Sequence, residues 1–103
     1  MPAIISVATW RPLPGKIQEF MTVVAAAKKI HERLGGRVRV FTSQFGGVPS
    51  TVLYAIEVDS WNAFGAFGEK VSADKEWLAL WAAGAASPTA ELVSNSTAVE
   101  AVV

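Results

Sequence analysis

The sequence of 103 residues contains no cysteine and only one histidine, His31. The absence of cysteine excludes disulfide bonds, thiolate nucleophiles, and zinc or iron–sulfur sites that are built on thiolates. Because a single histidine would need distant carboxylates to hold a metal ion, no metal site is expected. No cofactor is expected either.

The chain also lacks net charge, since nine Lys and Arg balance nine Asp and Glu. Without a basic excess there is no electrostatic attraction for nucleic acid or for an anionic membrane surface, and neither partner is expected. The first apolar run ends at Arg11, so it is too short to cross a membrane, and it lacks the flanks of a signal peptide. We therefore expect a cytoplasmic protein.

Large apolar side chains, in contrast, are abundant. The sequence is 51% hydrophobic and contains four Trp. A chain of this length is expected to form one domain, residues 1–103, with one modest core. This core cannot hold so much apolar surface, and some of it should face a partner or a ligand.

The longest segment of a single period, Pro14 to Gly36, predicts one helix. Its apolar side chains fall on one arc at about 100° per residue, and the other side is polar. Pro14 suits a first helical turn, and Gly35-Gly36 offers a left-handed cap. The apolar arc consists of Ile17, Phe20, Val23, Val24, Ala27, Ile30 and Leu34.

The remaining segments predict four strands and a second helical region. β-Branched, apolar or alternating residues indicate strands at 3–10, 37–45, 51–59 and 90–103. Ser60 is a good N-cap for a helix that runs to Ser72. Ser72-Ala73-Asp74 interrupts this helix and offers new capping side chains for a further apolar stripe, which ends before Ser87-Pro88.

The order strand, helix, strand, strand, helix, strand predicts an α+β, ferredoxin-like fold. A four-stranded antiparallel sheet would carry its helices on one face. Phe41, Phe45, Leu53 and Ala55 alternate away from the face that carries Tyr54, so the uncovered face would be partly apolar. We therefore predict a homodimer in which two sheets pack face to face.

Several segments together resemble the dimeric α+β barrel superfamily, and within it NIPSNAP-type proteins, with the antibiotic-biosynthesis monooxygenase type as a near neighbour. They are TWRPLPGKIQEF, LYAIEVDSWNAF, DKEW and SPTAELVSNS. The resemblance implies a barrel formed by the sheets of two subunits, with a hydrophobic pocket between sheet and helices in each. Its members include cofactor-independent oxygenases, haem-degrading enzymes, lactone isomerases and proteins without known activity, so the fold alone does not choose a function.

The haem-degrading branch of this superfamily is disfavoured by the residues present. That branch uses an Asn on the first strand and a Trp and a His on the later helix. Residues 3–10 contain no Asn, and the later helices contain Trp but no His.

His31 and Tyr54 are the candidate catalytic residues. His31 lies on the apolar arc, and it either acts on a ligand as a base or hydrogen-bond partner, or packs at the helix end against a backbone carbonyl or water, or is exposed. The second and third alternatives are favoured, because no partner is visible in the sequence. Tyr54 points toward the helices, where its hydroxyl needs a protein partner or a ligand.

The candidate pocket walls are mainly aromatic. The aromatic residues alternatively form ordinary core or dimer contacts, which helical spacing favours for Trp77 and Trp81. The predicted pocket residues are Trp10, Phe20, Val24, Trp61, Phe64, Trp77 and Trp81.

Other catalytic patterns find little support. Glu57 and Asp59 share a strand face, but turn and capping chemistry is favoured over a pair of catalytic carboxylates. The glycine pairs lack the lysine or helix start of a phosphate site, and no serine has a His–Asp partner.

The sequence therefore predicts a small dimeric barrel protein of unassigned role with a hydrophobic pocket for a small organic ligand. One alternative is a cofactor-independent monooxygenase or an isomerase that acts on an aromatic or polycyclic substrate, and another is a purely structural dimer. An open cavity of about 300 Å³ or more that His31 and Tyr54 face would favour ligand binding or catalysis, and a filled core would favour neither.

Overall fold

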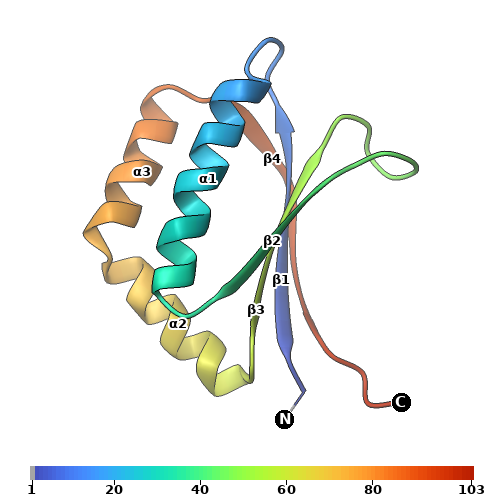
Figure 1. The fold of residues 1–103 in the computed structure, drawn as a ribbon, viewed down its shortest axis with the longest axis vertical. Helices are drawn as coiled ribbons and strands as arrows, with labels where there is room; N and C mark the ends of the chain where they lie inside the picture. Colours follow the sequence, from blue (N-terminus) through green and yellow to red (C-terminus); the bar gives the residue numbers. More distant parts are fainter. Residues whose placement is uncertain (1) are drawn as a thin grey trace.

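The computed structural model describes residues 2–103, which form four strands and three helices (Figure 1). In chain order they are β1 (Ile4–Pro12), α1 (Ile17–Arg33), β2 (Arg37–Thr42), β3 (Val52–Val58), α2 (Trp61–Ala73), α3 (Lys75–Ala86) and β4 (Ala90–Val99). This is the predicted element order, with the second helical region divided into α2 and α3 at Asp74.

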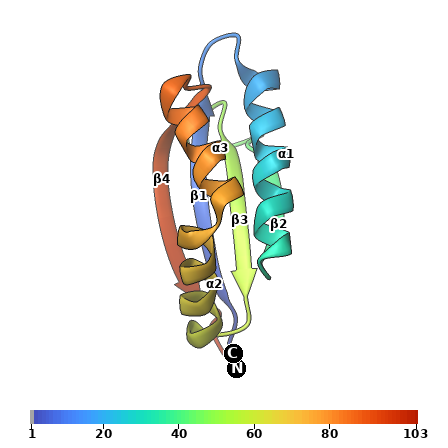
Figure 2. The same cartoon turned by 90° about the vertical axis from the view of Figure 1, so that its left-hand side faces the viewer.

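The strands form one antiparallel sheet in the order β2-β3-β1-β4. In the register, Ala55 of β3 lies opposite Val7 of β1. The register between β1 and β4 shifts at a bulge between Thr9 and Trp10. All three helices lie on one face, with α1 over β2 and with β4 beyond the edge of the helix layer (Figure 2). The predicted α+β, ferredoxin-like fold is confirmed.

Helix α1 packs through its predicted apolar arc and ends at the predicted glycines. Gly35 adopts a φ of +105°, and its N–H donates to the Glu32 carbonyl (3.2 Å). The Gly36 N–H donates to the carbonyl of His31, five residues back (2.9 Å). This pair of bonds is a Schellman motif, which satisfies carbonyls that the helix end would otherwise leave free.

Capping side chains fix the start of α2 and of α3 where they were predicted. The Ser60 hydroxyl accepts the Ala63 N–H (3.1 Å), and the Asp74 carboxylate accepts the Trp77 N–H (2.8 Å). The Trp77 N–H, together with the guanidinium of Arg33 on α1 at 2.8 Å, lowers the pKa of Asp74. Asp74 thus joins the start of α3 to the end of α1.

The predicted ends of α1 and β1 are wrong by up to three residues. Helix α1 begins at Ile17 rather than Pro14, because Pro14 and Gly15 lie in a turn and Gly15 has a φ of +76°. Strand β1 extends beyond Trp10 to Pro12, since its last residues still pair with β4.

The predicted ends of β2 and β4 are also wrong. Strand β2 ends at Thr42 rather than at residue 45, because the chain leaves the ladder before the loop that contains the left-handed Gly46 and Gly47. Strand β4 ends at Val99, the partner of Ile4, and so residues 100–103 lie outside it. Strand β3 and α2 differ from their predicted spans by a single residue at the ends.

The core is divided into two clusters of buried side chains. The larger cluster joins α1 to β2 and β3, and the smaller one joins Phe67 of α2 to Ile4 and Val58. Helix α3 contributes no buried residue. It lies beside α1 and leaves space between itself and the sheet. The larger cluster contains Phe20, Val24, Ala27, Val38, Val52 and Tyr54.

The face of the sheet away from the helices is partly apolar, as predicted, with one exception. Ala55 is buried, Leu53 is half-buried and Phe41 is 49% exposed. Phe45 lies in the loop after β2 and is almost fully exposed, so it does not belong to this face. Within residues 2–103, none of the helices is long and apolar enough to span a bilayer.

Candidate functional site

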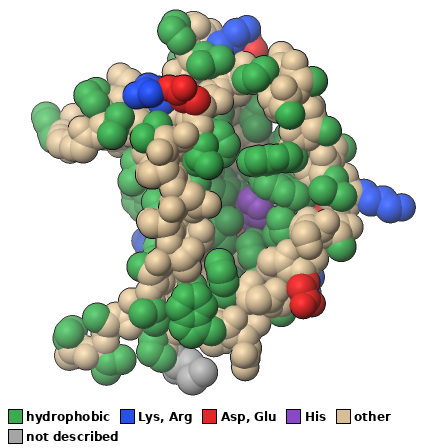
Figure 3. Space-filling model, turned by 180° about the vertical axis from the view of Figure 1, so that it is seen from behind, with side chains coloured by type: hydrophobic (Ala, Val, Ile, Leu, Met, Phe, Trp, Pro, Cys, Tyr) green, Lys and Arg blue, Asp and Glu red, His purple; other side chains and the backbone are tan. Residues whose placement is uncertain are grey.

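A cavity of about 500 Å³ lies between the sheet and the helices α1 and α3. It is open to solvent: in a space-filling view from behind, hydrophobic side chains surround a hollow in which the only histidine is visible (Figure 3). Among residues 2–103, no charged side chain lines this cavity, which is called the main cavity below. It therefore suits a molecule that is largely apolar.

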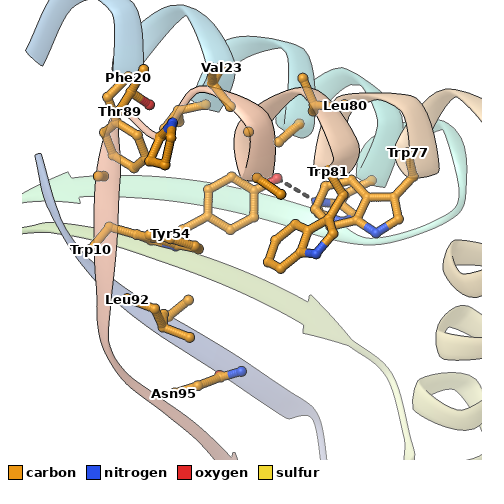
Figure 4. Close-up of a pocket in the computed structure, with 18 of the residues that line it drawn as sticks. Trp10, Phe20, Val23, Tyr54, Trp77, Leu80, Trp81, Thr89, Leu92 and Asn95 are labelled. Carbon is orange, nitrogen blue, oxygen red and sulfur yellow. Dashed lines mark hydrogen bonds between the residues drawn. The ribbon is translucent and has the colours of Figure 1, made fainter. Parts of the chain in front are cut away.

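Each wall of the main cavity follows from the period of its element. Alternate residues of β1 and β3 point toward the helices, and the i, i+3, i+4, i+7 spacing of α3 turns one stripe toward the strands. Trp77, Leu80 and Trp81 point from α3 toward Tyr54 and Trp10 on the sheet (Figure 4). The lining includes Ser6, Ala8, Trp10, Tyr54 and Ile56 from the strands β1 and β3, Phe20, Val24, Ala27 and His31 from α1, Trp77, Leu80, Trp81 and Gly84 from α3, and Leu92 and Asn95 from β4.

His31 and Tyr54 form the polar pair of the main cavity. His31 is only 4% exposed, and its Nδ1 lies 2.6 Å from the Tyr54 hydroxyl. Burial lowers the pKa of His31 from 6.5 to about 4. Burial, and secondarily the carboxylate of Glu32, raise the pKa of Tyr54. Both side chains are consequently neutral near pH 7.

The second ring nitrogen of His31 faces the cavity. Nε2 has no hydrogen bond within residues 2–103, yet no fully buried side-chain nitrogen or oxygen there lacks a partner. Nε2 is therefore accessible, and the spaces that reach this residue are the main cavity and a second hollow beside α2. If the Tyr54 O–H donates to Nδ1, both groups are satisfied and the imidazole proton is on Nε2. The pair then presents an N–H donor to a ligand.

An aromatic series extends from His31 to the mouth of the cavity. The rings of His31 and Trp77 are 4.5 Å apart, those of Trp77 and Trp81 5.6 Å, and those of Trp81 and Trp10 6.4 Å. Trp81 is 54% exposed although it lies over the cavity. Tilted and edge-on rings at these distances make a wall suited to a flat apolar molecule.

Most of the residues predicted for the pocket lie around this cavity. His31 and Tyr54 line it, together with Trp10, Phe20, Val24, Trp77 and Trp81. The geometry differs from the favoured sequence interpretation of His31, because the residue is buried and its partner is a side chain instead of a backbone carbonyl or water.

Trp61 and Phe64 do not line the main cavity. Trp61 is the first residue of α2 and is 58% exposed, because α2 starts beside the end of β3, away from the main cavity. Phe64 lines a second hollow between α2 and the sheet.

Three polar lining residues, Ser6, Thr89 and Asn95, were missed. The alternation of residues 3–10 already places Ser6 on the face of Trp10, so its position was available from the sequence. The position of Asn95 was not available from the sequence, because the direction of its side chain depends on the bulge opposite Thr9 and Trp10.

The other acidic candidates lie outside the cavity. Glu57 and Asp59 pair with Arg37 at 2.8 and 2.9 Å on an exposed edge of the sheet, so they form ion pairs rather than a carboxylate pair or a helix cap. Within residues 2–103, no group of three metal-binding side chains comes together.

Comparisons with known proteins identify the fold. No family model matches the sequence, and no match was found among curated proteins. An uncharacterized NIPSNAP domain protein from Burkholderia xenovorans is similar in structure, with 22% identity over 97% of this chain and 94% of the other, and a TM-score of 0.74. A NIPSNAP family protein of unknown function from Agrobacterium tumefaciens gives 21% identity over 96% and 88%, with a TM-score of 0.75.

The similar solved structures also include one of the monooxygenase type. A protein described as a putative antibiotic biosynthesis monooxygenase from Chloroflexus aurantiacus matches with 14% identity over 98% of this chain and 95% of its own, and a TM-score of 0.62. At these identities the likeness is one of fold. The chain therefore has the fold shared by NIPSNAP and monooxygenase-type structures, as the resemblance in its sequence implied.

Proposed function

We propose that the main cavity binds a small, uncharged and largely apolar organic molecule. The observation that carries this proposal is an open space of about 500 Å³, without a charged wall, that both His31 and Tyr54 line. Its volume is within the range of about 300–1,000 Å³ that is typical of ligand sites. A few polar groups in an aromatic wall are the usual composition of such a site.

The exposed aromatic wall supports binding over a purely structural role. Trp81 leaves more than half of its surface in water above the cavity. Burial of apolar surface stabilises a complex by about 25 cal/mol for each Å². A ligand that covers Trp81 and Trp77 would bury surface that the isolated chain leaves exposed.

A second candidate function is a cofactor-independent monooxygenase, favoured by the hydrogen-bonded His31–Tyr54 pair at the cavity. With a pKa of about 4, His31 is a weak base at neutral pH, so its suitable role is to donate Nε2–H to a substrate anion. In this reaction a phenolate substrate supplies all four electrons to O₂: its ring C–H and phenol O–H are lost as it becomes a quinone, one oxygen atom forms the new carbonyl and the other leaves as water. The neighbour from Chloroflexus aurantiacus is described as a putative monooxygenase, which adds support for this alternative.

The proposed functional unit is a homodimer joined through the outer faces of the two sheets. The apolar centre of this face contains Val7, Leu53 and Ala55. The ion pairs Arg37–Glu57 and Arg11–Glu91 flank this centre. An apolar centre inside a polar rim is the usual composition of a stable interface.

The test of ligand binding is a thermal-shift screen of neutral aromatic compounds such as 1-naphthol, 1,4-naphthoquinone and acetophenone. A ligand at 100 times its Kd should stabilise the protein by about 2.7 kcal/mol. Each binder is then incubated in an oxygen electrode, where oxygen uptake that is lost in Tyr54→Phe would identify the monooxygenase.

Two glycines provide a matched pair of variants for this test. Gly84 lines the main cavity, Gly65 does not, and an added Cβ meets nothing within 4 Å at either. Gly84→Leu should abolish the stabilisation by filling the cavity, and Gly65→Leu should retain it. A screen in which no compound stabilises the wild type, or in which Gly84→Leu still binds as tightly, would contradict ligand binding and favour the structural dimer.

A further inference from the structure

A second hollow of about 310 Å³ adjoins the main cavity. It lies between α2 and the sheet, and it is called the side hollow below. Phe64, Phe67, Gly68 and Val71 form its α2 wall, so it is apolar over most of its surface. Like the main cavity, it is lined by no charged side chain from the part of the chain that the structure describes.

The two spaces meet at a shared set of residues, which we call the waist. Ser6, His31, Ile56 and Trp77 line both the main cavity and the side hollow. Ser6 and Ile56 are a directly opposed pair on β1 and β3, and His31 and Trp77 come from the helices with their rings 4.5 Å apart. The waist is therefore bounded by the sheet on one side and by the helices on the other, and it lies between the two apolar spaces.

The waist carries three polar side chains that could meet a ligand, Ser6, His31 and Trp77. Neither Nε2 of His31 nor the hydroxyl of Ser6 has a hydrogen bond within the described part of the chain, although Nδ1 of His31 is bonded to Tyr54. The remaining hydroxyl of the side hollow, that of Ser72, already donates to the Glu69 carbonyl at 3.0 Å. Polar groups thus lie between the two spaces, in addition to Thr89 and Asn95 in the main cavity.

We infer that the two spaces form one elongated site for a ketone that joins a ring system to an alkyl chain. The ring occupies the main cavity, the chain occupies the side hollow, and the carbonyl oxygen accepts from Nε2–H of His31 and from the Ser6 hydroxyl. This inference rests on the proposed function and adds a ligand class to it.

The chemistry of the walls sets the limits of this ligand class. A carboxylate or an ammonium group would be desolvated here without an opposite charge, at a cost that the site does not offset. The polar groups at the waist, Nε2–H of His31, the Ser6 hydroxyl and the indole N–H of Trp77, all offer a proton, which selects an acceptor oxygen over an amine or an N–H group. The flat ring belongs in the larger space, because the Trp77 and Trp81 rings line that side.

The effect of the length of the ligand's alkyl chain is tested by isothermal titration calorimetry with acetophenone, butyrophenone and hexanophenone. A buried methylene contributes about 0.8 kcal/mol, so each added methylene should tighten binding about fourfold. Gly68→Leu fills the side hollow, and it should bind acetophenone as the wild type does but gain nothing from longer chains. Gly65→Leu, in the same helix but outside both spaces, should keep the wild-type series. Gly68→Met serves as a second variant if Gly68→Leu does not fold.

The position of the oxygen is tested with hexylbenzene, which lacks the carbonyl of hexanophenone. Ser6→Ala removes one donor at the waist and should weaken hexanophenone about two- to twelvefold, the range for one hydrogen bond. Its affinity for hexylbenzene should not change. Equal weakening of both compounds, or of neither, would overturn the placement of the carbonyl.

The outcomes separate this inference from the proposed function. If acetophenone binds in the wild type but longer chains bind no tighter, or if Gly68→Leu keeps the full gain with length, the elongated site is wrong and ligand binding by the main cavity stands. If none of the three alkyl phenyl ketones binds while 1-naphthol or 1,4-naphthoquinone does, the proposed ligand class is wrong and the proposed function again stands. If none of these compounds binds, both fail.

Discussion

His31 makes the stability of the protein depend on pH, because its charged form is excluded from the folded state. Burial lowers its pKa to about 4, whereas the unfolded chain has the ordinary value of 6.5. Between these values the unfolded state binds more protons, so the free energy of unfolding falls as the pH falls from 6.5 toward 4. The full shift corresponds to about 3 kcal/mol.

This dependence is measured by urea unfolding at pH 7.0, 5.5 and 4.5 in the wild type and in His31→Phe. Phenylalanine retains a ring beside Trp77 but does not titrate, and carboxylates titrate in both proteins. We expect the wild type to lose more stability than the variant in this interval. Parallel losses in the two proteins would mean that His31 keeps an ordinary pKa in the folded state.

The sequence placed His31 and Tyr54 on facing surfaces, but it could not show that they meet. The helical arc turns His31 toward the sheet, and the alternation of β3 turns Tyr54 toward the helices. Their 2.6 Å contact depends on how far α1 extends along β3. No local pattern encodes that offset, which explains why the favoured interpretation gave His31 no side-chain partner.

At the scale of elements, the two glycines after α1 are required for different structural reasons. A Cβ at Gly36 would lie 2.8 Å from Ile56 and 2.9 Å from Phe67, and both are packed side chains. At Gly35 a Cβ meets nothing within 4 Å, but the φ of +105° disfavours any other residue. The first glycine is required by conformation and the second by packing.

Gly36→Ala should therefore lower the free energy of unfolding by about 1–3 kcal/mol, the usual cost of overpacking. Gly35→Ala should cost about 1–2 kcal/mol through its backbone alone. Urea denaturation of Gly36→Ala in an Ile56→Ala background separates the two causes, because alanine lacks the Ile56 Cγ2 atom that lies 2.8 Å from the added Cβ and so relieves only a packing clash. If that background gives Gly36→Ala no relief while Gly35→Ala is unaffected by it, we would assign the cost at Gly36 to the backbone.

The sequence predicted the type and order of the helices and strands better than the residues at which they end. Ser60 and Asp74 cap α2 and α3 as expected, since a capping side chain acts within three residues. The strand ends depend instead on distant partners: β4 stops at Val99, which lies opposite Ile4. Local composition around residues 100–103 does not carry this information.

At the scale of the whole molecule, the element order was enough to predict the sheet and the helix layer, but not the cavity. The spacing of Trp77, Leu80 and Trp81 is the same for a helix that packs into a core and for one that lines an open space. The difference lies in the distance of α3 from the sheet, and α3 buries no residue. Ordinary core packing was favoured for Trp77 and Trp81 because the pattern alone cannot tell these arrangements apart.

The outer face of the sheet determines the state of association that we expect. Ile5 and Val7 on β1 are half-buried, and Phe41 on β2 is 49% exposed beneath the guanidinium of Arg39, which lies 5.7 Å from the ring centroid. A second copy would cover this apolar strip. Val7→Glu places a charge at its centre, where it would be desolvated without a partner, so we expect the dimer to dissociate.

Sedimentation equilibrium at micromolar concentration measures this outcome. The wild type should have twice the 10.9 kDa mass of the chain, and Val7→Glu should have the mass of one chain. Lys29→Glu, on the exposed side of α1, introduces the same side chain away from the sheet and should remain dimeric. A wild type that sediments as one chain would show that the outer face is stable in water, whereas a Val7→Glu protein that remains dimeric would place the interface on another surface.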